Sequence, residues 1–176
     1  MTQVEHHYKS IVSSIPSSVQ LVAVSKTKPA SQILELYNCG HRKFGESKAQ
    51  EMVSKYEQLP KDIQWHMIGH LQTNKVKYIA PFVSLIHSVD SLKLLMAINK
   101  EGFKNNRVID CLMQMYIAKE ETKFGLDPEE IDQILQSAEY KSMKNIRITG
   151  LMGMATLTDD TNLIGSEFET LAGCRL

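Results

Sequence analysis

Cysteines and long hydrophobic runs are scarce in this sequence. Its three cysteines, Cys39, Cys111 and Cys174, form neither a CxxC pair nor a zinc-binding pattern, which argues against a disulfide-rich fold and a cysteine-ligated metal site. Residues 1–7 are polar and lack the apolar segment of a signal peptide. No stretch of the sequence approaches the roughly 18 apolar residues that a membrane helix needs. We therefore expect a cytoplasmic protein with reduced thiols and no membrane partner.

An excess of either charge is also missing, because 20 lysines and arginines are balanced by 20 aspartates and glutamates. This balance gives no electrostatic basis for binding nucleic acid. Neither GxGxxG nor GxxxxGK[ST] occurs, so the ordinary dinucleotide-binding and P-loop motifs are absent from the sequence. A length of 176 residues is sufficient for a hydrophobic core, and we expect a single domain over residues 1–176.

Apolar segments of strand length alternate with helix-favouring segments along the chain. The predicted strands are residues 20–25, 43–46, 64–71, 83–89, 108–117 and 147–155. The predicted helices are residues 30–39, 47–59, 73–79 and 160–171, with one more running from Asp90 or Ser91 to Phe103 and another capped by Asp127. Strands that alternate with helices in this way predict a parallel sheet built from βα units.

Two α/β architectures fit this order of elements, an open doubly wound sheet and a (β/α) barrel of the TIM type. Both architectures bind their ligands at the carboxyl ends of the strands. Polar residues lie at these strand ends or just after them: Lys26, Ser47, His70, Ser88, Asp90, Glu120, Glu121, Lys123 and Thr156. The functional site is therefore expected at this edge of the sheet.

Lys26 directly follows the first predicted strand, so its amine is expected at the rim of the core. Partial burial there would favour the neutral amine, which can attack an aldehyde and form a Schiff base. The alternative is a lysine whose charged end extends into solvent. Its position alone favours this second interpretation.

Three histidines, His66, His70 and His87, lie on or near the predicted third and fourth strands. His66 and His70 would lie about 13 Å apart along one strand. Because zinc ligands lie within about 2.1 Å of the ion, we expect these histidines to form hydrogen bonds at the rim of the sheet rather than to bind a metal. Met152 and Met154 share one face of the sixth predicted strand and are expected in the core or in the wall of a pocket.

Six segments together carry a resemblance to one family. They are LVAVSKTKP (residues 21–29), RKFGES (42–47), IQWHMIGHLQTNK (63–75), LIHSVDSLKL (85–94), EETKFGL (120–126) and ITGLMGMATLTDD (148–160). The chain resembles the YggS-like family of pyridoxal-phosphate-binding proteins, also called pyridoxal phosphate (PLP) homeostasis proteins. The matching segments occur in the family's order over nearly the whole chain.

The resemblance implies a fold-type III barrel similar to that of alanine racemase, with a Schiff base between Lys26 and PLP. The cofactor-binding residues expected with Lys26 are Ser47, His70, Ser88 and Met152. The implied function is to bind PLP and take part in vitamin B6 homeostasis, without robust catalysis and with the cofactor as the main partner. The alternatives are a cofactor-free interaction module and a PLP-dependent amino-acid racemase, for which Tyr116 is the nearest candidate for a second acid or base.

Two features depart from the family pattern. Ser47 stands where the family has the asparagine of FGEN, so any contact of that amide is lost. The chain has six predicted strand–helix units where a complete barrel has eight. The resemblance places most of the phosphate-binding segments in the last units. We therefore expect residues 1–176 to lack those segments, to bind PLP weakly or not at all, and to be monomeric unless open sheet edges associate.

Overall fold

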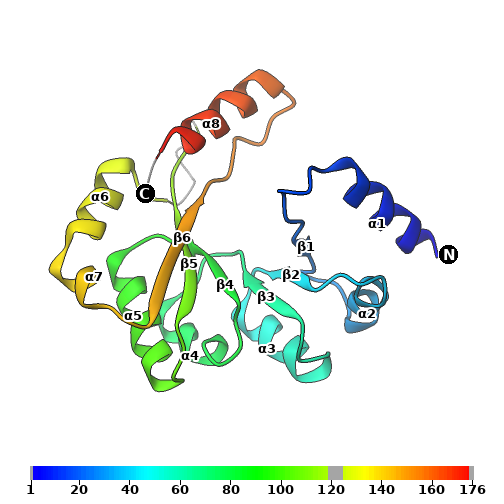
Figure 1. The fold of residues 1–176 in the computed structure, drawn as a ribbon, viewed down its shortest axis with the longest axis horizontal. Helices are drawn as coiled ribbons and strands as arrows, with labels where there is room; N and C mark the ends of the chain where they lie inside the picture. The colour runs from blue at the N-terminus through cyan, green and yellow to red at the C-terminus, as the bar shows by residue number, and fades with distance from the viewer. Residues whose placement is uncertain (1, 119–124, 175–176) are drawn as a thin grey trace.

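The computed structural model describes residues 2–118 and 125–174, which form a single parallel sheet with flanking helices (Figure 1). The strands are β1 (Ala23–Val24), β2 (Lys43–Glu46), β3 (Gln64–Met67), β4 (Leu85–Val89), β5 (Ile109–Gln114) and β6 (Ile146–Met152). Their spatial order follows the order in the chain, and every neighbouring pair is parallel. This order is that of a (β/α) barrel, because a doubly wound sheet reverses its strand order at a switch point. Over the described residues the barrel is open, with β1 and β6 at its two edges.

Helices follow every strand. Those that connect successive strands are α2 (Ala30–Asn38), α3 (Ala49–Gln58), α4 (Val76–Ile79), α5 (Leu92–Lys104), α6 (Pro128–Gln136) and α7 (Ala138–Ser142), with a short 3₁₀ helix, η1 (Thr73–Lys75), before α4. The helix α8 (Thr161–Gly173) follows β6. Of the two predicted caps of α5, Asp90 and Ser91, the structure has Ser91, whose hydroxyl accepts the Leu94 N–H. Asp127 caps α6 in a reciprocal capping box with Glu130. Local side-chain signals therefore placed these helix starts correctly.

Five of the six predicted strands were too long. The first, expected as a buried strand over residues 20–25, is only Ala23–Val24, and Val24 is 53% exposed because β1 is an edge strand. The third, expected to reach Leu71, ends at Met67, after which the chain turns into the loop that carries His70. The fourth, expected over residues 83–89, is Leu85–Val89. The fifth, expected over 108–117, is Ile109–Gln114, and the sixth, expected over 147–155, is Ile146–Met152. Two helices were not predicted, α7 and the N-terminal α1 (Gln3–Ser14), which has no buried residue.

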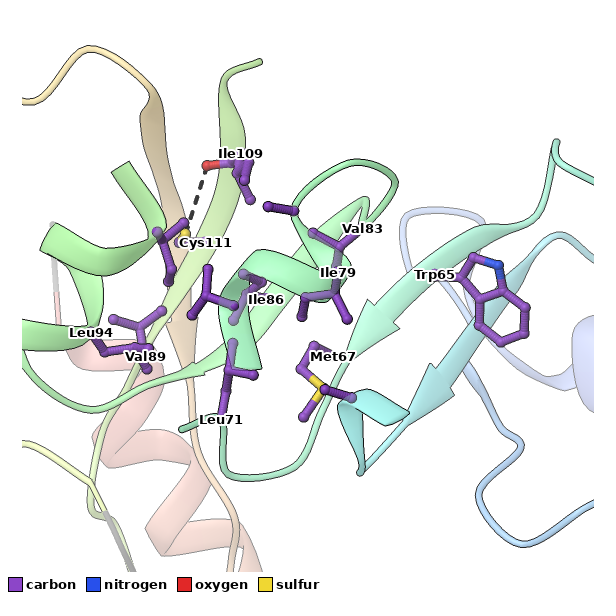
Figure 2. Packing of buried hydrophobic residues seen from close by; sticks show 14 of the residues in the cluster. Trp65, Met67, Leu71, Ile79, Val83, Ile86, Val89, Leu94, Ile109 and Cys111 are labelled. Atoms are coloured by element: carbon purple, nitrogen blue, oxygen red, sulfur yellow. Dashed lines mark hydrogen bonds between the residues drawn. The ribbon is translucent and has the colours of Figure 1, made fainter. Parts of the chain in front are cut away.

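The core lies between the sheet and the helices that pack on it (Figure 2). Its fully buried side chains come from both layers: Phe44, Met52, Trp65, Met67, Ile79, Ile86, Leu94, Leu95, Ile98, Ile109 and Met113. Cys111 belongs to the same cluster, and its burial raises the pKa of the thiol to about 12. At neutral pH this cysteine is therefore an apolar core residue rather than a nucleophile. Within the described ranges, every helix is too short or too polar to cross a membrane.

Candidate functional site

The five residues expected from the sequence to bind the cofactor lie at the carboxyl edge of the sheet. Lys26 and Ser47 follow the ends of β1 and β2, and His70 lies in the loop after β3. Ser88 is the last residue but one of β4, and Met152 is the last residue of β6. Parallel strands bring these ends to one side of the sheet, but Lys26 follows β1 and Met152 ends β6, and these are the two outermost strands of the open sheet. The open sheet therefore does not bring these two residues together through neighbouring strands.

Lys26 itself is solvent-exposed. Its amine makes no hydrogen bond or ion pair with any residue that the structure describes. Of the two interpretations that the sequence left open, the structure shows the lysine that extends into solvent, because the two-residue β1 ends before Lys26. The side chain is an accessible primary amine at the edge where this fold binds ligands.

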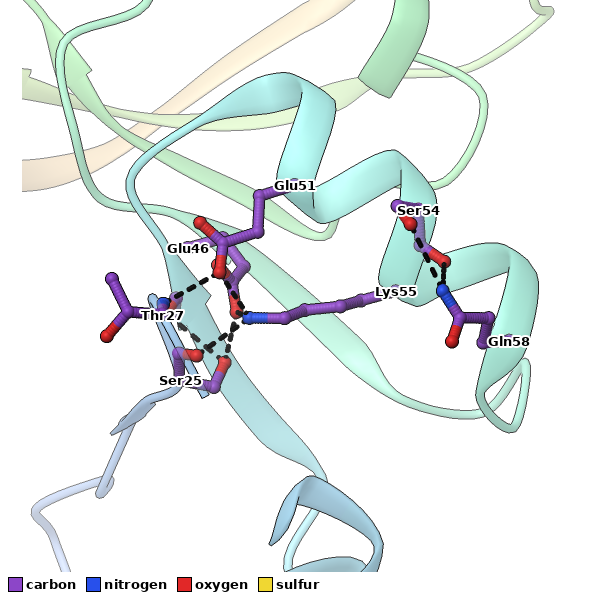
Figure 3. Close-up of polar contacts among 8 residues, drawn as sticks. Ser25, Thr27, Glu46, Glu51, Ser54, Lys55 and Gln58 are labelled. Carbon is purple, nitrogen blue, oxygen red and sulfur yellow. Dashed lines mark hydrogen bonds and ion pairs between the residues drawn. The ribbon is translucent and has the colours of Figure 1, made fainter. Parts of the chain in front are cut away.

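The backbone on either side of Lys26 is held by buried polar groups (Figure 3). Ser25 is 4% exposed, and its hydroxyl donates to Oε1 of Glu46 at 2.5 Å. Lys55, from α3, donates from Nζ to the Ser25 carbonyl, to Oε1 of Glu46 and to Oε1 of Glu51, each at 2.7 Å. The same Glu51 oxygen accepts the backbone N–H of Thr27 at 2.7 Å. Residues on both sides of Lys26 are thus tied to α3 and β2.

This network was missed from the sequence. Glu51 and Lys55 stand four residues apart, the spacing of an ordinary helical ion pair, and such pairs are usually exposed. Nothing in the sequence indicates that the Lys55 side chain is 8% exposed and the Glu46 side chain fully buried. The contact between Lys55 and Ser25 spans 30 residues, so it depends on how α3 packs against β1 and β2.

The loop after β3 lies close to the end of β2. A side chain at Gly69 would place its Cβ 2.5 Å from the Ser47 carbonyl oxygen, so only glycine allows this approach. Ser88 is buried, and its hydroxyl donates to the Gly69 carbonyl at 2.6 Å. The neighbouring His70 has a 52% exposed side chain, with its Nδ1 3.1 Å from Oδ2 of Asp90. Ser88 therefore fixes the loop that presents His70.

The three histidines do not converge on one point. Nδ1 of His66 lies 2.8 Å from Nε2 of His87, across β3 and β4, whereas His70 contacts Asp90 instead. Burial lowers the pKa of His66 to about 4 and also lowers the pKa of His87. Both rings are therefore neutral at pH 7, and one donates its ring N–H to the other.

The sequence also indicated Thr156, Tyr116 and a charged segment after the fifth predicted strand as candidates. Thr156, after β6, is held by Glu167 of α8, whose carboxylate accepts from the Thr156 N–H and hydroxyl at 2.7 Å each. The candidate acid or base Tyr116 follows β5 and is half-buried. The charged segment with Glu120, Glu121 and Lys123 lies outside the described residues.

Comparisons with known proteins agree with this geometry. The sequence profile of the family described as alanine racemase, N-terminal domain, matches residues 1–174. A pyridoxal phosphate homeostasis protein of Aquifex aeolicus (strain VF5) is 40% identical over 158 residues, which are 89% of this chain and 68% of that protein. One from Synechocystis sp. is 36% identical over 170 residues, covering 94% of this chain and 77% of that protein.

Solved structures show the same likeness. PipY of Synechococcus elongatus, solved with PLP bound, has a TM-score of 0.86 and 32% identity, covering 97% of this chain and 79% of that chain. An alanine racemase of Clostridium difficile has a TM-score of 0.74 at 12% identity, covering 95% of this chain and 45% of that chain, which is a likeness of fold alone.

Proposed function

This chain belongs to the pyridoxal phosphate homeostasis protein family, within the alanine racemase N-terminal domain family, and we propose that it binds PLP through Lys26 and takes part in PLP homeostasis. The observation that carries the proposal is the exposed Lys26 amine at the carboxyl edge of the sheet, free of hydrogen bonds to the described residues. The cofactor, when bound, supplies an aldehyde that a lysine amine can attack, and a phosphate. The PLP-bound PipY structure supports the same ligand for this fold.

The side chains around Lys26 fit such a ligand. Ser47 offers a half-buried hydroxyl beside the end of β2, and His70 offers an exposed imidazole from the next loop. Both can donate hydrogen bonds to an oxygen-rich cofactor. Ser88 acts indirectly, because its hydroxyl is already used by the Gly69 carbonyl and thereby orients the His70 loop. We propose Met152, the last residue of β6, as an apolar part of the wall of the ligand site.

A carrier role suits this arrangement better than catalysis of a reaction. An exposed lysine can capture a reactive aldehyde and leaves it accessible to a second amine, which favours holding and handing on PLP. The racemase alternative needs an acid or base on the opposite side of the cofactor, and Tyr116 is the residue to test for it. Incubating the PLP-loaded protein with L-alanine and measuring D-alanine tests this alternative, and sustained D-alanine formation would favour the enzyme.

Two further parts of the proposal concern the protein's surroundings. A cytoplasmic location fits the three free cysteines, since free thiols persist in reducing compartments. A monomer in solution is proposed as the resting state, with the outer edge of β6 as the place where another strand could pair. Sedimentation velocity over a range of concentrations tests this state, and a constant dimer mass would contradict it.

The proposed function is tested by titration with PLP, followed through its absorbance spectrum. We propose that wild-type protein binds PLP, although weakly, as expected from the sequence, and gives a spectral change that saturates at high PLP concentrations. Lys26→Ala is expected to lose this change. Lys28→Ala is the matched control, because Lys28 is also exposed and lies two residues away in the same loop. If Lys26→Ala and wild type titrate alike, the proposed role of Lys26 is wrong.

A further inference from the structure

The turn around Lys26 has a strained backbone. Thr27 has a φ of +64°, in the left-handed region that β-branched residues rarely adopt. Its neighbour Lys28 donates its N–H to the Ser25 carbonyl at 3.0 Å, which closes a tight turn with Lys26 inside it. A strained turn of this kind persists only where surrounding contacts hold it.

The contacts that hold the turn come from three charged side chains. Glu51 accepts the Thr27 N–H at 2.7 Å, a hydrogen bond strengthened by the charge of the carboxylate. Lys55 holds the Ser25 carbonyl at 2.7 Å, and Glu46 accepts from the Ser25 hydroxyl at 2.5 Å. The backbone is therefore fixed immediately before and immediately after Lys26 (Figure 3).

Lys55 is not a second amine for an aldehyde. An ammonium has three N–H donors, and Lys55 uses them on three acceptors, the Ser25 carbonyl, Glu46 and Glu51, all at 2.7 Å. Its side chain is 8% exposed, whereas Lys26 is exposed and unpaired among the described residues. Lys26 is thus available to react with an aldehyde, whereas Lys55 holds the backbone beside it.

We propose that Glu46, Glu51 and Lys55 are positioning residues for cofactor capture, which hold residues 25–27 in the strained turn that presents the Lys26 amine. None of the three contacts the cofactor in this proposal. It rests on the proposed binding of PLP at Lys26, and it adds that the affinity of Lys26 for PLP depends on a network that lies behind it. Thr27 connects the turn to this network, because its backbone N–H donates to Glu51.

The sharpest test removes Glu51, whose side chain is 27% exposed, so that its loss leaves no deeply buried charge without a partner. Glu51→Ala is expected to weaken the apparent affinity for PLP about tenfold, the effect of one lost charge-assisted hydrogen bond. Glu51→Gln keeps an oxygen that can accept from Thr27 and is expected to restore most of the affinity. The matched control is Glu101→Ala, which removes a carboxylate paired with Lys104 at 2.7 Å on the distant α5.

A second variant separates positioning from general stability. Thr27→Gly removes the steric cost of the left-handed backbone. In the Thr27→Gly variant the backbone of the turn is no longer strained and needs less support from Glu51. Adding Glu51→Ala to this variant is therefore expected to weaken PLP affinity less than threefold. A residue that only stabilised the fold would lower affinity by the same factor in both backgrounds. Circular dichroism and the midpoint of urea unfolding are measured on every variant.

Different results would refute the proposed function and the proposed positioning role. If Lys26→Ala leaves PLP binding unchanged, the proposed function fails. If Lys26 is required but Glu51→Ala binds PLP like wild type and the Glu101→Ala control, the positioning proposal is wrong. Equal losses of affinity for Glu51→Ala with Thr27 and with glycine at that position would also overturn it.

Discussion

Removal of the Lys55 amine should destabilise the fold strongly. In Lys55→Met the flexible apolar stem is kept, but the ammonium that contacts Glu46, Glu51 and the Ser25 carbonyl is lost. Glu46 is 0% exposed and its Oε2 has no hydrogen-bond partner among the described residues, so its negative charge would depend on Ser25 alone. Breaking a buried ion pair by removing one partner costs about 3–5 kcal/mol. This cost is a large part of the roughly 5–15 kcal/mol that stabilises an ordinary domain.

Urea unfolding followed by circular dichroism measures this loss. The double variant Lys55→Met with Glu46→Gln also removes the buried negative charge, and we expect it to recover at least about half of the lost free energy of unfolding, because no buried ion then remains unpaired. Lys104→Met is the control, because Lys104 has a 54% exposed side chain in its ion pair with Glu101, and it should change the free energy of unfolding by less than about 1 kcal/mol. A loss below about 1 kcal/mol in Lys55→Met, or no recovery in the double variant, would refute the reasoning.

Three further predictions concern other parts of the fold. Burial lowers the pKa of His66 to about 4, so the stability that the neutral ring contributes is complete above pH 7 and is lost, by roughly 3 kcal/mol, as the pH falls from about 6.5 to 4. In His66→Gln the midpoint of urea unfolding should therefore depend less on pH over this range. The same pH dependence in His66→Gln and wild type would contradict this prediction. Gly69→Ala should destabilise by about 1–3 kcal/mol, since its Cβ would lie 2.5 Å from the Ser47 carbonyl, whereas Gly165→Ala, with nothing within 4 Å, should stabilise α8 slightly; equal midpoints for the two variants would count against this packing. Cys111 should resist thiol reagents in the folded protein and react only after urea unfolding, because burial raises its pKa to about 12; rapid native labelling of Cys111 would contradict its place in the core.

The parts of the fold that the sequence predicted are those that depend on neighbouring residues. The strand Lys43–Glu46 was predicted with its correct bounds, and the caps at Ser91 and Asp127 were correct because a cap acts within one helical turn. The helix Gln3–Ser14 was missed because it has no buried face and so lacks the apolar periodicity of a core helix.

The candidate site was predictable only in part. Its position at the carboxyl edge follows from the parallel sheet, and the motif around Lys26 indicates the ligand class. The support behind Lys26 could not be predicted, since Lys55 reaches Ser25 across 30 residues and the burial of that pair depends on tertiary packing. The roles of Ser47, His70 and Met152 stay predictions.

Peptide mapping after borohydride reduction tests directly whether Lys26 is the lysine that captures PLP. The protein is mixed with PLP at a ratio of one to one, reduced, digested and analysed by mass spectrometry, so that each lysine that captured the aldehyde carries a stable adduct. We expect the adduct to form mainly on Lys26, with little on Lys28 and none on Lys55, whose three N–H groups are all hydrogen-bonded. An adduct spread evenly over the exposed lysines, with Lys26 modified no more than Lys28, would contradict this expectation.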